Sequence, residues 1–290
     1  MTGRLWGTVA LLMFHLGFGA HVGADEQRDQ PVVTPAPVVY LDVQASTWRP
    51  RGRISFGIEP ILRMKLTSAG FGVTQDPGRQ HDFTVRVEYR EERGEPIAVN
   101  SYGTHIFCRI LLDHPQSERG QLISIHESPS YRDLVHAPYV EVVEKLETNP
   151  YFFFLGDIVR GWHQKLDTTG ALIEALDRQF SEELHRPPAT PMDTLVSPAE
   201  TFPDLEAHFA PAAQENTVDE LGRLGDARAI GLLERLMMKA DRNTRLHAVH
   251  AMGQFDAPSI VPALTRVVQT DTDSLVRNAA SDVLVQLSTR

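Results

Sequence analysis

Hydrophobic positions in the first part of the chain alternate between strand-like and helix-like spacing. Val38–Val43 is a short, β-branched apolar run, which is typical of a buried strand. Apolar residues then recur at every fourth position over residues 58–66, and the pair Gly70-Phe71 stops the helix that this spacing predicts. Residues 82–90 alternate apolar and polar side chains with a period of two, which predicts a half-buried antiparallel strand.

Two further alternating segments, His105–Leu112 and Gln121–Glu127, flank a polar loop and predict a hairpin. Aligning Ile110 with Ile123 places the apolar side chains of both segments on one face, so we predict this register.

Helices are predicted to close this unit. One opens at Pro138, a second follows the cap-like pair Asn149-Pro150, and a third begins near Thr168. The apolar run Tyr151–Leu155 is assigned to the core. The order of elements predicts an α+β domain over residues 38–185, with a mixed or antiparallel sheet and helices on one face.

Two proline-containing segments divide the rest of the chain. Residues 25–37 are predicted to form an extended leader, and residues 186–212 a Pro-rich linker. The linker contains six prolines, which leave no room for a long helix or a central strand. His208 and Phe209 lie within it and are a candidate docking point.

An internal repeat occupies residues 213–290. Residues 221–230 (LGRLGDARAI) align with 252–261 (MGQFDAPSIV) at an offset of 31, and residues 244–248 align with 276–280 at an offset of 32. Each repeat has a Gly-terminated helix, then an Asp-capped helix and a second helix that begins near an Arg. With its period of 31–32 residues, this pattern resembles HEAT-like repeats of the phycobilisome-lyase type. The resemblance implies stacked helical hairpins that offer a concave face to a protein partner.

Two residue types in the repeat have predicted structural roles. Asp226 and Asp256 are expected to cap the first helix of each pair. Gly222 and Gly253 are expected to end the second helices and to allow the turn.

The candidate protein-binding residues lie on the second helices of the repeat. They are Arg242, Arg245, His247, His250, Arg277 and Asn278. Arg245 and Arg277 also suit internal contacts with acidic neighbours, because charges in such arrays are usually solvated or paired. His247 and His250 share a helix face, but neither has a neighbouring Glu, which favours surface histidines over a metal pair.

Residues 1–24 have the pattern of a secretory signal peptide. Arg4 precedes the apolar run Leu5–Phe18, and small residues lead to a predicted cleavage site after Ala24. The run is shorter than the roughly 20 residues of a membrane span, which favours cleavage over a retained anchor. We therefore expect a periplasmic or secreted protein with no stable membrane span.

Composition and charge narrow the function classes. The 290 residues include 38 acidic and 28 basic side chains, for a net charge of −10, and no local basic patch offsets it, so nucleic-acid binding is not expected. The single cysteine, Cys108, allows no internal disulfide and no thiolate cluster, and its apolar neighbours predict a buried, inert thiol. No Gly-rich phosphate loop, nucleophile elbow or zincin motif is present.

These observations favour a non-enzymatic protein-binding or scaffold protein of the bacterial cell envelope, with a protein partner there and no cofactor or metal. The alternative is an envelope hydrolase or metal-dependent enzyme that gathers at least three polar residues of the α+β domain in one cleft. Its candidates are His81, Asp82, His105, Asp113, His114, His126, Glu127 and His136. The repeat subtype also raises a third possibility, lyase-type handling of a chromophore.

Overall fold

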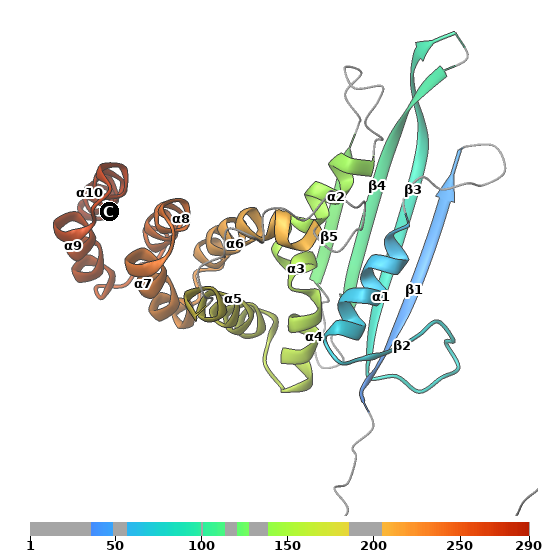
Figure 1. Cartoon of the computed structure of the whole chain (residues 1–290), viewed down its shortest axis with the longest axis horizontal. Coiled ribbons are helices and arrows are strands. Elements are labelled where there is room, and N and C mark those ends of the chain that lie inside the picture. The colour runs from blue at the N-terminus through green and yellow to red at the C-terminus, as the bar shows by residue number, and fades with distance from the viewer. Residues whose placement is uncertain are drawn as a thin grey trace, which may run out of the picture. The chain divides into compact units, whose positions relative to one another are not determined.

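The computed structural model describes residues 36–48, 57–99, 101–113, 121–127, 139–185 and 205–289. Five strands form one sheet; one helix lies between its first two strands in the chain, and the other helices follow the last strand (Figure 1). The strands are β1 (Val38–Thr47), β2 (Gly72–Thr74), β3 (Phe83–Ala98), β4 (Ser101–Asp113) and β5 (Gln121–Glu127). The first helices are α1 (Ile58–Ser68), α2 (Tyr139–Glu147), α3 (Pro150–Phe153), α4 (Leu155–His163) and α5 (Thr168–His185). They are followed by α6 (Leu205–Leu224), the 3-10 helix η4 (Ala227–Ala229), α7 (Ile230–Lys239), α8 (Arg242–Met252), α9 (Ile260–Thr270) and α10 (Ser274–Ser288).

The sheet is mixed and has the order β2-β1-β3-β4-β5. β1 runs parallel to β2 and β3, whereas β3, β4 and β5 are antiparallel to their neighbours. Ile110 lies opposite Ile123, which confirms the predicted register of the β4–β5 pair and sets Cys108 opposite Ile125. The predicted α+β class is also confirmed. The three-residue strand β2 was not predicted, because so short a segment carries no measurable period.

Each central strand buries one face and exposes the other. In β3, Val85, Val87 and Tyr89 are buried, whereas the alternating Arg86 and Arg90 are exposed. Helix α1 contributes Ile58, Leu62 and Leu66 to the same core. The period-two and period-four patterns of the sequence therefore correspond to one shared core between the sheet and its helices.

Two of the predicted helix ends are confirmed. Gly70 follows α1 with a φ of 93°, and the Phe71 amide donates to the Leu66 carbonyl. Asn149 caps α3, since its side chain accepts hydrogen bonds from the amides of Tyr151 and Phe152. The helix predicted after Asn149 is interrupted at Phe154, which separates α3 from α4.

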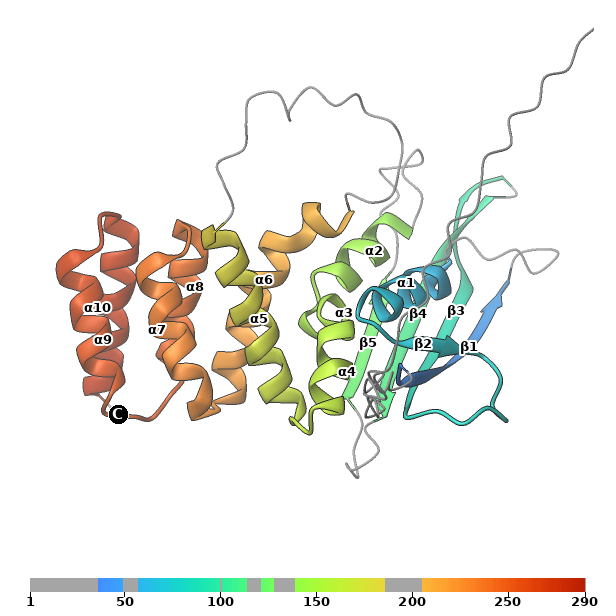
Figure 2. The same ribbon diagram turned by 60° about the horizontal axis from the view of Figure 1, so that its bottom comes forward.

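The C-terminal helices pack in pairs. α7 packs against α8 and α9 against α10, and α5 packs against α6 in the same way. Figure 1 shows α5, α7 and α9 in one layer and α6, α8 and α10 in the other, and Figure 2 shows the pairs stacked in sequence order. Helix α5 was predicted to close the α+β domain, and it also serves as the first helix of the first pair.

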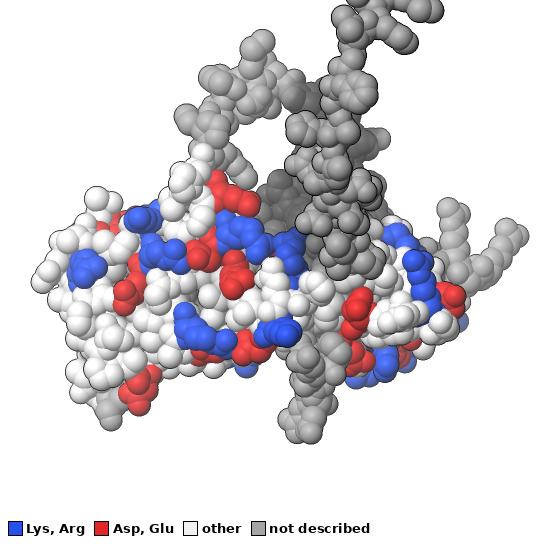
Figure 3. Space-filling model, turned by 90° about the horizontal axis from the view of Figure 1, so that it is seen from below, with Lys and Arg blue, Asp and Glu red and all other residues white. Residues whose placement is uncertain are grey.

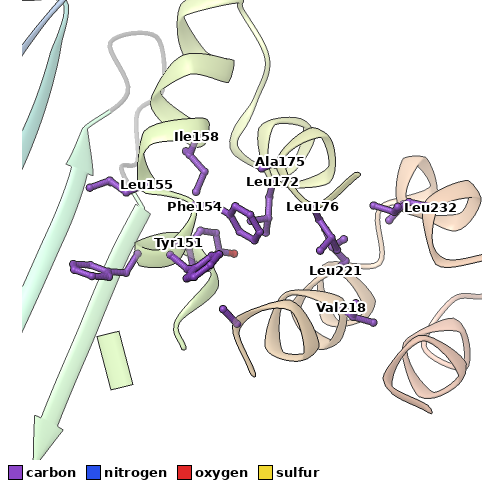
Figure 4. Close-up of a cluster of buried hydrophobic side chains, with 14 of the residues drawn as sticks. Tyr151, Phe154, Leu155, Ile158, Leu172, Ala175, Leu176, Val218, Leu221 and Leu232 are labelled. Atoms are coloured by element: carbon purple, nitrogen blue, oxygen red, sulfur yellow. The ribbon is translucent and has the colours of Figure 1, made fainter. Parts of the chain in front are cut away.

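One hydrophobic core runs from the helices that cover the sheet into the helical pairs. Figure 4 shows Phe154 and Ile158 meeting Leu172 of α5, and Leu176 of α5 meeting Leu221 of α6. The run Tyr151–Leu155 is buried, which confirms its assignment to the core. Because burial of apolar surface is the dominant stabilising term in folding, the repeats and the sheet region support each other.

Hydrogen bonds reinforce this junction. The Tyr151 hydroxyl donates to Glu220 of α6, and the Asn216 amide donates to the Thr148 carbonyl at 2.8 Å. Arg223 also donates to Glu220 at 2.6 Å. Burial opposes ionisation of the Glu220 carboxyl, but its hydrogen bonds from Arg223 and Tyr151 lower its pKa below the usual value.

Helix α6 corrects the prediction that prolines exclude a long helix before residue 212. It begins at Leu205 and continues through Pro211. Proline removes one helical hydrogen bond, but the following turns are held by the buried residues Ala213 and Val218. Within α6, His208 is exposed and Phe209 packs against the core.

The prediction that the glycines of the repeat end the second helices is confirmed at one of two positions. Gly253 is the C-terminal cap residue of α8, with an ordinary helical φ of −65°, whereas Gly222 lies inside α6. A Cβ atom on Gly222 would lie 2.7 Å from the Ala251 Cα atom, and one on Gly253 would lie 2.9 Å from Val283 Cγ1. Both glycines therefore let neighbouring second helices approach closely. The turn after α6 uses Gly225 instead, with a φ of 67°.

The predicted caps are confirmed at one of two positions. The Asp226 side chain accepts a hydrogen bond from the Arg228 amide at the start of η4. Helix α9 instead begins after Ser259, with no side-chain capping bond, so the prediction for Asp256 is wrong. Residues 257–259 separate Asp256 from the first residue of α9, so its carboxylate does not cap the helix.

Candidate functional site

The second helices α8 and α10 begin at aspartate caps that the sequence analysis missed. The Asp241 side chain accepts hydrogen bonds from the amides of Asn243 and Thr244, and Asp273 accepts one from the Leu275 amide. Asp241 and Asp273 are 32 residues apart, which is the repeat offset, so the alignment contained the signal that could have found them.

Arg245 is a structural residue of the array. Its guanidinium donates to both carboxylate oxygens of Asp271, at 2.9 and 3.2 Å, and to the Ala240 carbonyl at 2.9 Å. The side chains of Arg245 and Asp271 are only 17% and 6% exposed. This bidentate pair connects α8 to the loop before α10 and stabilises the stacking of successive repeats.

Arg242 and Arg277 also make internal contacts. Arg242 forms a 3.0 Å ion pair with Asp273, and Arg277 donates to the Asp271 carbonyl at 2.7 Å. Arg242 therefore pairs with an acidic neighbour within the array, whereas Arg277 bonds to a backbone carbonyl.

The other three predicted residues are more accessible. His250 and Asn278 are exposed on α8 and α10. His247 is partly exposed, and its Nδ1 atom lies 2.9 Å from Asp219 of α6, while its Nε2 atom lies 3.7 Å from Glu215. The surface of α6, α8 and α10 therefore offers imidazole, amide and carboxylate groups, and His247 contacts the carboxylates of α6.

The opposite layer of helices carries charges of both signs, several of which form ion pairs. Figure 3 shows positive and negative side chains interleaved on this side of the molecule. Arg235 of α7 pairs with Asp177 of α5 at 2.7 Å, and Arg228 pairs with Asp167 at 2.8 Å. Such exposed pairs contribute little to stability, and they leave no single-sign field for steering a ligand.

The enzyme candidates are spread along the sheet where the structure describes them. His105 lies opposite Glu92, whereas Asp113 lies opposite Thr84, eight residues earlier on β3. At about 3.3 Å per residue, these two positions are roughly 26 Å apart. No group of three His, Cys, Asp or Glu side chains that could hold a metal occurs among the described residues.

The remaining enzyme candidates have local contacts or are not described. His81 Nδ1 contacts the Arg79 carbonyl at 2.9 Å, and the Asp82 carboxylate accepts a hydrogen bond from the Val38 amide at 2.7 Å. His126 and Glu127 are placed only by their register on β5, opposite Phe107 and Ile106. His114 and His136 lie outside the described residues.

The described surface has small hollows. One of about 170 Å³ lies between α1 and α4 and is lined by Met64, Ser68, Gly156 and Arg160 among others. A second, of about 160 Å³, lies beside Arg245 and Asp271. Both are smaller than the roughly 300–1,000 Å³ of typical small-molecule sites.

Cys108 is a buried thiol, as predicted. Its side chain is inaccessible on β4, and burial raises the pKa of the thiol to about 12. Because the thiolate is the reactive form, we expect Cys108 to resist iodoacetamide at neutral pH in the native protein and to be alkylated rapidly once the protein is unfolded in urea. Mass spectrometry of timed samples checks this; native alkylation at the rate of the unfolded chain would contradict it.

The comparisons with known proteins agree with the helical pairs. Residues 201–285 match the family model of HEAT repeats. No curated protein and no solved structure matches the chain. The HEAT match assigns the C-terminal region to a class of repeats that is used as a scaffold for protein interaction. Within the described part of the chain, every helix is too short or too polar to span a membrane.

Proposed function

We propose that this protein is an exported, non-enzymatic scaffold of the bacterial cell envelope that binds a partner protein through the second helices of its HEAT repeats. The observation that carries the proposal is the surface of α6, α8 and α10, where His247, His250 and Asn278 stay accessible while the neighbouring arginines hold the array together. Helical arrays with a fixed backbone and a variable polar surface are typical protein-binding elements.

The proposed location rests on the sequence. An apolar run after Arg4 and small residues up to Ala24 support export and cleavage. A single buried cysteine is compatible with the periplasm, because the chain does not depend on disulfides for stability.

The test is an affinity pull-down from periplasmic extract with tagged residues 25–290. Removing the repeats is not a clean comparison, because α5 packs against α6 and Tyr151 bonds to Glu220 across the cut. Surface variants of the full mature chain are therefore used. We expect His250→Glu combined with Asn278→Glu to lose the partner that the wild type recovers, since both side chains are exposed and new charges disrupt a polar interface.

The matched control changes the opposite layer of helices. Gln269→Glu at an exposed position of α9 is combined with Ser181→Glu at a half-buried position of α5. This variant adds the same charge and should retain the partner. Retention by both variants, or loss by both, would show that the second helices are not the recognition surface. Circular dichroism and thermal melts confirm that each variant is folded.

A further inference from the structure

The outer edge of β1 has no partner strand among the described residues over much of its length. β1 pairs with β3 from Val39 to Thr47, but β2 covers its other edge only from Val38 to Tyr40. Beyond Tyr40, no strand among the described residues pairs with this edge, and Figure 1 shows that end of β1 at the rim of the sheet.

The direction of the backbone groups follows from the hydrogen bonds at each end of β1. The Trp48 amide donates to the Glu91 carbonyl of β3, whereas the Pro37 carbonyl accepts from Gly72 on the β2 side. Successive residues of a strand direct their backbone groups to opposite edges. Odd-numbered residues of β1, here Leu41, Val43 and Ala45, therefore direct their N–H and C=O groups to the open edge.

This edge lacks the features that usually block strand addition. From Leu41 to Ser46 it contains no proline, no lysine and no bulge, and Asp42 is its single charge. Gln44, Ala45 and Ser46 are exposed. An exposed, regular and nearly neutral edge is a template for another strand.

We infer that the open edge of β1 pairs with β1 of a second copy of this chain, antiparallel and across a two-fold axis at Gln44. The two five-stranded sheets then form one continuous sheet. The chain's own preceding segment is a poor alternative, because Pro31, Pro35 and Pro37 have no N–H to donate to a strand ladder. A two-fold arrangement also gives both copies the same contacts.

The register is set by side-chain complementarity. With Gln44 on the axis, Asp42 lies opposite Ser46 of the second copy, and Val43 lies opposite Ala45 of the second copy. An axis at Asp42 would place two carboxylates opposite each other, which is unfavourable. The axis at Gln44 also uses the greatest length of β1 beyond the part that β2 covers.

Gln44 offers a direct test, because facing even-numbered residues form non-hydrogen-bonded pairs in this register. The Cα atoms of such pairs are about 4.5 Å apart, which is within the range for a disulfide. We expect Gln44→Cys to give, under mild oxidation, a disulfide-linked species of twice the monomer mass. The native Cys108 does not compete, since it is buried.

Arg90→Cys is the matched control. Arg90 is also exposed, but it lies on the central strand β3, opposite Ser46 of the same chain. It should form at least tenfold less linked dimer than Gln44→Cys at equal protein concentration. Equal cross-linking of the two variants, or none with Gln44→Cys, would overturn the proposal.

A pair of lysine variants tests the register without a covalent bond. Gln44→Lys places two ammonium groups opposite each other on the axis, so sedimentation equilibrium should show at least a tenfold weaker dimer than the wild type. Ser46→Lys places its charge opposite Asp42 and should retain the dimer. Both are exposed positions, so the fold is kept. A wild-type chain that stays monomeric across the micromolar range, or a dimer weakened equally by both variants, refutes the inference.

Discussion

Replacing Gly222 by alanine is expected to destabilise the protein by about 1–3 kcal/mol, even though alanine is the better helix former. A Cβ atom at this position would lie 2.7 Å from the Ala251 Cα atom and 3.1 Å from the Ala251 carbonyl oxygen. Both are backbone atoms of α8, so no side-chain rotation can relieve the overlap. The two helices must separate, and the core between them loses contacts. Urea unfolding followed by circular dichroism measures the change.

Gly231→Ala is the matched control. Gly231 is the second residue of α7, and a Cβ atom there would meet no atom within 4 Å. The same substitution should therefore stabilise the protein by about 0.5–1 kcal/mol through helix propensity alone. Opposite signs at the two glycines would establish that helix approach decides the effect at Gly222. A neutral or stabilising Gly222→Ala would refute the packing role.

The sheet and its pairing could be predicted because period-two alternation determines which side chains share a face. In β4, Cys108 and Ile110 face the same core as the alternating residues of β3, and the predicted register sets them opposite Ile125 and Ile123 of β5. A shift by one residue would have exposed all of these apolar side chains. Local patterns were also sufficient for the Gly70 stop and the Asn149 cap, which depend on residues a few positions away.

The roles that depend on tertiary contacts could not be predicted in this way. The apolar stripe of α5 faces both α4 and α6, but its period is the same whether it closes a domain or begins an array. Helix propensity correctly identifies Pro211 as unfavourable in a helix, yet α6 continues through it because the following turns pack against the core. Gly222 and Gly253 were correctly located, but a close approach of helices is visible only in three dimensions.

For the candidate binding residues too, the sequence predicts the position in a helix but not the tertiary contacts. The sequence indicates that Arg245 lies at the start of a second helix, but not that Asp271, in the following repeat, meets it with both carboxylate oxygens. Aligning the repeats at offset 32 shows Asp241 and Asp273 as equivalent residues. Asp271 has Lys239 at its equivalent position, so no repeat pattern identifies it.

Replacing Lys65 by methionine is expected to destabilise the protein by about 3–5 kcal/mol, more than the loss expected at Gly222. Lys65 of α1 and Glu147 of α2 form a 2.8 Å ion pair with side chains that are 5% and 6% exposed. The Lys65 ammonium also lies 5.2 Å from the ring centroids of both Phe152 and Phe153. Methionine keeps the apolar stem but leaves the Glu147 carboxylate buried without this counter-charge.

Two controls separate charge from packing. Arg63 lies on the same helix and pairs with Glu59, but both side chains are 38% exposed, so Arg63→Met should cost less than about 1 kcal/mol. Adding Glu147→Gln to Lys65→Met removes the buried negative charge and should recover part of the loss, because the desolvation of an ion is the costly term. If Lys65→Met and Arg63→Met lowered the free energy of unfolding equally, breaking a buried ion pair would cost no more than breaking an exposed one, which would contradict the prediction. A large loss of stability with Lys65→Met that Glu147→Gln partly reverses would show that the loss comes from the buried Glu147 charge. This charge lies where α1 and α2 meet the aromatic residues of α3.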